Sequence, residues 1–148
     1  MKFVFNEEKN EERRRMLMMQ PTIEEGKALL ARDDTDAYAW YVYGKALSIQ
    51  KDYEAAIEAH SHGIACDPFY APNYFGRGGK MSLTGRLWSA LADYSVALHL
   101  DSSNWLYWYY RATTLNLAGY LEESIDDFRQ CMKVMDPKEH YPLVHWIY

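Results

Sequence analysis

Large and small side chains recur at helical spacing in the middle of the chain. Two trios of such residues, each at steps of four and three, lie on either side of a polar break at residues 51–52. They are Trp40, Gly44 and Leu47, and then Ala56, His60 and Gly63. This spacing places each trio on one side of an α-helix. The pattern therefore predicts two helices joined by a short turn, which is a helical hairpin.

The hairpin pattern returns twice, each time 34 residues further along the chain. Large residues return at large positions and small residues at small ones. The second copy has Tyr74, Gly78, Met81, Ala90, Tyr94 and Ala97, and the third has Trp108, Ala112, Leu115, Ser124, Phe128 and Cys131. Gly85 and Gly119 stand at the break between the helices. A fixed period of this length predicts repeats at residues 37–70, 71–104 and 105–138.

Two helix patterns precede the repeats, within residues 1–36. A charged stretch from Asn6 to Met19 reads as a helix that ends before Pro21. Thr22 followed by Glu25 fits a capping box at the start of a second helix. We expect this segment to be a helical cap or the second half of a degenerate leading repeat.

The last ten residues, 139–148, are nearly all apolar after His140 and start a further helix. A solenoid needs a polar cap on its final repeat, and this segment supplies none. Two alternatives follow: the chain is a fragment of a longer repeat protein, or another copy covers the open end. We favour the fragment, with self-association through the uncapped end as a side effect.

The repeated hairpins resemble the tetratricopeptide repeat over about residues 37–138. The residues of the first copy that carry the resemblance are Trp40, Tyr43, Gly44, Leu47, Ala56, His60 and Pro68. The resemblance implies an all-α fold, an α-α superhelix in which antiparallel helix pairs stack into a right-handed solenoid. It also implies that the first helices line a concave groove. Arg77 and Arg111 depart from the pattern, because a Leu is typical at their position.

Composition narrows the classes of partner. A formal charge of -5 and a pI near 5.5 disfavour binding to nucleic acid or to an anionic membrane surface. Cys66 and Cys131 form neither a disulfide framework nor a metal-ligand spacing. The start of the chain lacks the apolar centre of a signal peptide, and no stretch is long enough for a transmembrane helix. If Met1 is the natural start, we expect a cytoplasmic protein.

Catalytic and cofactor motifs are absent from the sequence. The glycine-rich stretch at residues 76–80 fits neither a dinucleotide fingerprint nor a phosphate-binding loop. His60 and His62 are two residues apart and so lie on different helix faces, which gives no zinc motif. His60 occupies a large-residue position, so a packed core histidine is the favoured interpretation. We expect no enzymatic activity, no cofactor and no bound metal.

A second stripe on each first helix is a candidate binding surface. Its members lie two residues before the Trp40 position and then one, five and eight after it. They are Tyr38, Tyr41, Lys45 and Ser48, then Pro72, Phe75, Gly79 and Ser82, and then Leu106, Tyr109, Thr113 and Asn116. The resemblance implies that this stripe lines the groove. Tyr41, Phe75 and Tyr109 would then form an aromatic row, unless neighbouring helices or the N-terminal segment cover it.

The predicted function is a protein-interaction scaffold that binds a peptide or partner helix in the groove. In related proteins a carboxylate clamp holds the C-terminal tail of a chaperone, but the matching positions here hold Tyr41, Lys45, Gly76, Leu106 and Tyr110. The resemblance therefore implies an apolar or aromatic-bearing partner rather than such a tail. Gly79 could allow close approach of a partner backbone. The alternatives are a self-assembling or spacer module, and an accessory repeat domain of a larger enzyme.

Overall fold

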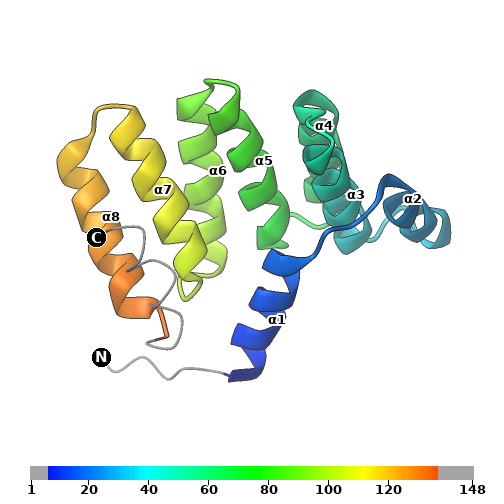
Figure 1. Cartoon of the computed structure of the whole chain (residues 1–148), viewed down its shortest axis with the longest axis horizontal. Coiled ribbons are helices and arrows are strands. Elements are labelled where there is room, and N and C mark those ends of the chain that lie inside the picture. The colour runs from blue at the N-terminus through cyan, green and yellow to red at the C-terminus, as the bar shows by residue number, and fades with distance from the viewer. Residues whose placement is uncertain (1–6, 137–148) are drawn as a thin grey trace.

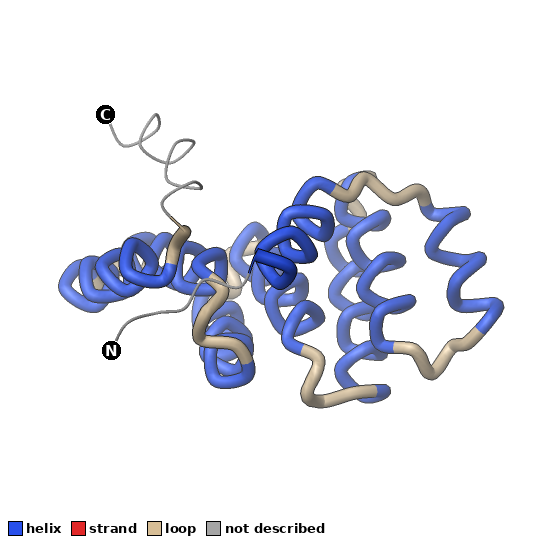
Figure 2. Tube along the Cα trace, turned by 90° about the horizontal axis from the view of Figure 1, so that it is seen from below, coloured by secondary structure: helices blue, strands red, loops and turns tan. Residues whose placement is uncertain are grey.

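Eight α-helices and no strand make up residues 7–136, the part of the chain that the computed structural model describes (Figure 1). The helices are α1 (Glu7–Met18), α2 (Ile23–Arg32), α3 (Ala37–Ile49), α4 (Tyr53–Cys66), α5 (Ala71–Leu83), α6 (Leu87–Leu100), α7 (Trp105–Leu117) and α8 (Leu121–Val134). Short loops join them (Figure 2). The predicted helix at residues 139–148, and self-association through it, lie outside the described residues.

Helices α3 to α8 form three hairpins that stand side by side in chain order (Figure 1). Each first helix packs on its own second helix and on the second helix of the preceding hairpin. The first helices begin at residues 37, 71 and 105, which is the period that the sequence predicts. The described chain is therefore a helical superhelix of stacked pairs, with α3, α5 and α7 in one layer.

The turns repeat with the same period as the helices. Inside each hairpin the turn places one residue in the left-handed region, with φ of 63° at Lys51, 82° at Gly85 and 90° at Gly119. Glycine adopts this conformation without steric cost. The first turn thus has the same backbone shape as the others but carries a lysine.

The first large residue of each repeat, at the Trp40 position, donates a hydrogen bond to the turn that precedes its helix. Trp40 donates its indole N–H to the carbonyl of Asp34 at 2.7 Å, and Trp108 donates to that of Ser102 at 2.8 Å. The hydroxyl of Tyr74 donates to Pro68 in the same way at 2.9 Å. The acceptor lies six residues back in every repeat. A large aromatic side chain with one polar atom can therefore fill the core position and also donate a hydrogen bond to the preceding turn.

Ion pairs explain the two arginines that depart from the repeat pattern. Arg77 on α5 donates from Nε and Nη2 to the carboxylate of Asp93 on α6, both at 2.8 Å. Arg111 on α7 makes the same two contacts with Asp127 on α8, at 2.6 and 2.9 Å. Each arginine also reaches a serine of the preceding hairpin, and these are Ser61 at 3.3 Å and Ser95 at 3.2 Å. The pairs connect the two helices of a hairpin to the hairpin before it.

His60 is the polar centre of the contact between the first two hairpins. Its side chain is 1% exposed, and Nδ1 lies 2.9 Å from Oδ1 of Asn73, whose Nδ2 donates to the carbonyl of Ala37 at 3.0 Å. A Cβ added at Gly44 or Gly76 would lie 2.7 or 2.5 Å from the imidazole ring. The ring therefore occupies the space that these glycines leave between α3 and α5.

Helix α2 packs against α3 as a second helix would pack in a preceding hairpin. Thr22 caps it by accepting from the backbone N–H of Glu25 at 3.1 Å, as the sequence predicts. A Cβ added at Gly26 would lie 2.8 Å from Cα of Tyr43, so the two backbones approach closely there. Helix α2 therefore occupies the place of a second helix in front of the first hairpin, and its assignment as a cap or as half of a degenerate repeat stays a prediction.

Breaking the Arg77–Asp93 pair is expected to destabilise the protein. The variant Asp93→Ala leaves a half-buried guanidinium without its partner, so the free energy of unfolding should fall by about 3 kcal/mol. Adding Arg77→Tyr recreates the pair in the first hairpin, where Tyr43 and Ala59 stand at the equivalent positions. The double variant should therefore recover most of the loss in urea unfolding followed by circular dichroism. A double variant no more stable than Asp93→Ala would contradict this account.

Protonation of His60 is expected to oppose folding at acidic pH. Burial lowers the pKa of His60 to about 4, although the hydrogen bond with Asn73 opposes the shift. As the pH falls below about 6.5, the unfolded chain binds a proton before the folded one does. The contribution of neutral His60 to the free energy of unfolding is fully present above about pH 6.5. It decreases by about 3 kcal/mol as the pH falls to about 4.

Urea unfolding at a series of pH values measures this loss. The variant His60→Gln removes the titrating group and should flatten the pH dependence between about pH 6.5 and 4. The variant His62→Gln is the matched control, because His62 lies outside the core and stacks on Trp40 with ring centroids 4.6 Å apart. Equal pH dependence in wild type and His60→Gln would exclude His60 as the cause.

Candidate functional site

A pocket of about 300 Å³ lies on the side of the first helices that faces α1. Six of the residues predicted for the groove line it, and they are Tyr41, Lys45, Ser48, Pro72, Phe75 and Leu106. The other lining residues are Arg13, Met16, Leu17, Ile49, His60, Gly76, Lys80, Asn104, Tyr107 and Tyr110. Half of the stripe predicted from the repeats therefore lines one pocket, with residues from α3, α5 and α7.

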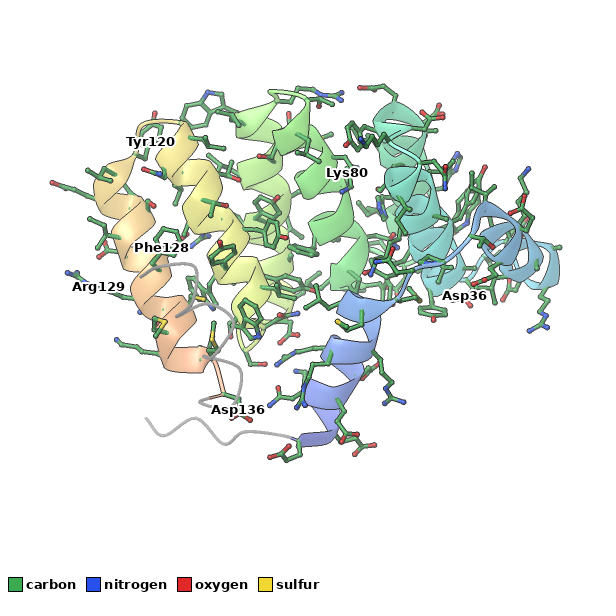
Figure 3. All side chains as sticks on the ribbon, in the orientation of Figure 1. Asp36, Lys80, Tyr120, Phe128, Arg129 and Asp136 are labelled. Carbon is green, nitrogen blue, oxygen red and sulfur yellow. The ribbon has the colours of Figure 1, made fainter. Side chains whose placement is uncertain are left out.

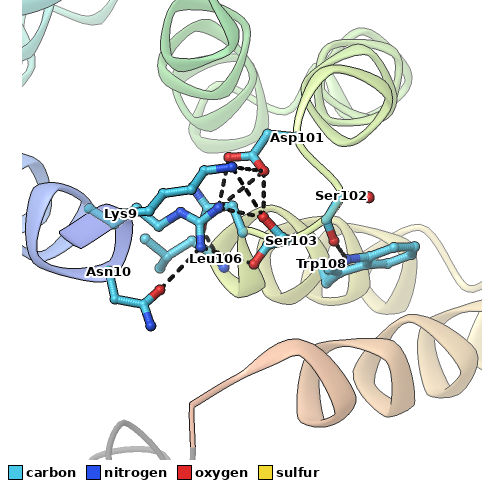
Figure 4. A network of polar contacts seen from close by, with 9 residues as sticks. Lys9, Asn10, Asp101, Ser102, Ser103, Leu106 and Trp108 are labelled. Carbon is cyan, nitrogen blue, oxygen red and sulfur yellow. Dashed lines mark hydrogen bonds and ion pairs between the residues drawn. The ribbon is translucent and has the colours of Figure 1, made fainter. Parts of the chain in front are cut away.

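Helix α1 forms the outer wall of this pocket. Arg13 donates from Nη2 to both carboxylate oxygens of Asp101 at 3.0 Å, and from Nη1 to the carbonyl of Ser103 at 3.1 Å. Lys9 adds a contact to Asp101 at 3.2 Å (Figure 4). These groups attach α1 to the turn between α6 and α7. The N-terminal segment therefore folds over the groove, which is the covered arrangement given above as an alternative.

Asp101 is the acceptor on which this attachment depends. Burial alone would raise its pKa, but hydrogen bonds from Ser103 and Arg13 and the charges of Arg13 and Lys9 lower the pKa below its usual value. The carboxylate is therefore charged at neutral pH, as a partner of two cations should be.

The other end of α1 is held by Lys45. Its ammonium donates to the carbonyl of Leu17 at 3.2 Å and also to that of Met16. These carbonyls belong to the last turn of α1, where backbone acceptors lack helical partners and the helix dipole is negative. A groove residue therefore caps α1.

Aromatic rings form the inner wall of the pocket. Phe75 lies 5.0 Å from Tyr107 and 5.1 Å from Tyr110 between ring centroids, the second pair edge to face. Tyr41 is buried and lies 5.9 Å from the ring of His60. Tyr110 is 38% exposed and stands at the open side. The wall offers apolar surface that a partner side chain can reach past Tyr110.

The remaining predicted residues do not line this pocket. Tyr38 lies in a second hollow, of about 440 Å³, with Glu12, Met19 and Tyr70. Five others line neither hollow, and they are Gly79, Ser82, Tyr109, Thr113 and Asn116. Tyr109 packs against Trp105 and Phe128 instead, at centroid distances of 6.4 and 5.9 Å. The predicted aromatic row therefore divides, with Tyr41 and Phe75 in the pocket and Tyr109 outside it.

The glycine-rich stretch of α5 serves packing at two of its three positions. A Cβ added at Gly76 or Gly78 would lie 2.5 Å from His60 or 3.0 Å from Tyr94. A Cβ at Gly79 would make only an ordinary contact, 3.8 Å from the hydroxyl of Tyr94. Gly79 is thus the one glycine of the stretch without a close internal neighbour.

Sequence reasoning missed Arg13, Lys80 and Tyr110 as lining residues. Arg13 binds an acceptor 88 residues further on, and no local pattern reports such a contact. Lys80 and Tyr110 lie outside the stripe that the repeat spacing defines. Lys80 ends the glycine-rich stretch at residues 76–80, which was weighed above only as a dinucleotide or phosphate site, and Tyr110 belongs to an aromatic run at residues 107–110.

Neither a metal-ligand cluster nor a membrane-spanning helix occurs within residues 7–136. No group of three or more His, Cys, Asp or Glu side chains there could hold a metal ion. Across the same residues, no helix combines the length and the apolar character needed to cross a bilayer.

Comparisons with known proteins agree with the helical architecture. No family model matches the sequence. The chain is 24% identical over 106 residues to the protein bimA of Emericella nidulans, which covers 72% of this chain but only 13% of that protein.

Two solved structures show the similarity in three dimensions. TTC0263, a thermophilic TPR protein of Thermus thermophilus, superposes with a TM-score of 0.74 at 22% identity, covering 84% of this chain and 69% of that one. The second TPR of Spaghetti (RPAP3), bound to the HSP90 peptide SRMEEVD, gives 0.66 at 25% identity, covering 74% and 99%. The repeat period, the stacked hairpins and these matches agree, and the described chain has a tetratricopeptide-repeat-like fold.

Proposed function

We propose that the chain is a non-catalytic module that binds a segment of a partner protein in the groove between α1 and the first helices. The observation that carries the proposal is the pocket of about 300 Å³, in which residues of three successive repeats meet. Its walls combine aromatic rings with a few polar groups, which is typical of a recognition site. The groove residues that line neither hollow, among them Thr113 and Asn116, would extend the contact along α7.

The open side of the groove at Tyr110 can admit a partner beside α1. Helix α1 is attached to the repeats by Lys9 and Arg13 at one end and by the acceptors of Lys45 at the other. The contact of Lys9 is exposed and contributes little stability, whereas the pair of Arg13 with Asp101 is largely buried and fixes α1 more firmly. A partner is therefore expected to bind beside α1, past Tyr110, rather than to displace it.

Related proteins support the class of partner. The structure of Spaghetti (RPAP3) holds a peptide of HSP90, so this fold accommodates an extended segment in that protein. The clamp positions here hold Tyr41, Lys45 and Gly76 among others, which argues against a chaperone tail as the ligand. An aromatic or apolar segment fits the walls of the pocket better.

Site-specific photocrosslinking tests the proposal with a matched pair of positions. A photoreactive phenylalanine analogue replaces Tyr110 at the pocket, or Tyr120 at the turn between α7 and α8 (Figure 3). Both tyrosines are 38% exposed. A partner from the native cell extract should crosslink at residue 110 and not at 120, because only the first position faces the groove.

A direct affinity measurement completes the test. The crosslinked protein is identified, purified and titrated against wild type and Tyr110→Ala, and we expect the variant to bind about tenfold or more weakly. Tyr120→Ala should leave the affinity unchanged. Crosslinks only to a second copy of this chain would favour the self-assembly alternative. Equal affinity of wild type and Tyr110→Ala would exclude the groove as the site.

A further inference from the structure

The pocket contains cations but no carboxylate. Arg13, Lys45 and Lys80 line it, and no Asp or Glu does, although the whole chain carries a formal charge of -5. The negative charges of the protein therefore lie elsewhere. This local excess of positive charge is the feature from which we infer the chemistry of the ligand.

Lys80 is the least compensated cation of the pocket. It lies on α5 (Figure 3), and its ammonium makes no ion pair with any residue in the described range 7–136. Its one recorded partner is the ring of Tyr53, with Nζ 5.9 Å from the centroid. Burial lowers the pKa of Lys80 below the ordinary value, because the charged form has lost part of its water.

Lys45 is close enough to Lys80 for the two charges to repel. Burial lowers the pKa of Lys45 first, and the charge of Lys80 lowers it further. Within the described residues, the only acceptors of Lys45 are the neutral carbonyls at the end of α1. Two neighbouring, half-buried ammonium groups therefore line the same pocket, and no carboxylate of the described residues lies between them.

Other half-buried cations of this protein have carboxylate partners. Arg77 pairs with Asp93, Arg111 with Asp127, and Arg13 with Asp101. Removing a charge from water is costly unless an opposite charge compensates it. Neither Lys45 nor Lys80 has a carboxylate partner among the described residues, since Lys45 meets only the carbonyls at the negative end of α1. Ionisable groups perturbed by burial in a hollow are typical of functional sites.

We propose that Lys80 and Lys45 bind the carboxylate of an internal Asp or Glu of the partner segment, with an adjacent aromatic or apolar side chain of that segment against Phe75 and Tyr110. The proposal rests on the proposed function and specifies its ligand. A pocket of about 300 Å³ holds one or two side chains of this size. Charge-assisted hydrogen bonds to two ammonium groups would fix the register of the segment in the groove.

A pair of blocked dipeptides tests this inference on the whole chain. The probes are N-acetyl-glutamyl-phenylalaninamide and its glutaminyl counterpart, which differ only in the charge of one side chain. Binding is followed by amide chemical shifts in two-dimensional NMR. The glutamyl peptide should shift the signals around Lys45, Phe75 and Lys80 and bind about tenfold more tightly than the glutaminyl peptide.

Two lysine variants locate the charge that is responsible. Lys80→Met should reduce the affinity for the glutamyl peptide to that for the glutaminyl one. Its midpoint of urea unfolding should stay equal or rise, because an apolar side chain replaces an uncompensated charge. Lys27→Met is the matched control, since Lys27 is an exposed lysine of α2 outside the pocket, and it should leave binding unchanged.

Each other outcome overturns the inference in a recognisable way. Equal binding of both peptides at the pocket would leave groove recognition intact and exclude a role for the carboxylate. A charge preference that survives Lys80→Met would exclude the lysine pair as its cause. Absence of shifts at the pocket with either peptide would exclude the acidic ligand, while the crosslinking at Tyr110 decides the proposed function separately.

Discussion

Close approach of neighbouring helices is the constraint on which this structure depends. At Gly44, Gly76 and Gly26 a single added carbon would lie within 3 Å of a residue on another helix. Ala56, Ala90 and Ala112 are completely buried at small positions of the hairpins. The small positions recur every 34 residues, so the same close helix–helix contact forms in each of the three hairpins. The superhelix results from the repetition of this contact.

The same constraint places the polar groups that the core contains. His60 fits between two glycines and is satisfied by Asn73, so its burial costs less than that of an unpaired imidazole. In the next hairpin Tyr94 takes the equivalent place against Gly78. The pocket lies beside these contacts, because His60 and Gly76 belong both to the interior and to its lining. The interior and the proposed binding surface therefore share residues at the junction of the first two hairpins.

Most of the fold could be predicted from the sequence, because repeated spacing is a local signal that occurs three times. The helix pairs and their period follow from it directly, and the cap at Thr22 follows from the capping-box pattern with Glu25. The Arg77–Asp93 pair was not predicted, although both residues recur together as Arg111 and Asp127. The position of α1 could not be predicted either, because it depends on contacts of Lys9, Arg13 and Lys45 that have no counterpart in another repeat. Half of the candidate groove could be foreseen, and its outer wall could not.

The serine contacts of the two arginines bear on how such an array can grow. The middle hairpin carries an arginine that reaches back to Ser61, and it presents Ser95 to the arginine of the next hairpin. The middle hairpin therefore contains both the arginine and the serine that one contact between hairpins requires. A tandem duplication of residues 71–104 would create a new boundary in which this arginine–serine contact already exists, so the solenoid could lengthen by one unit without a further substitution at that contact.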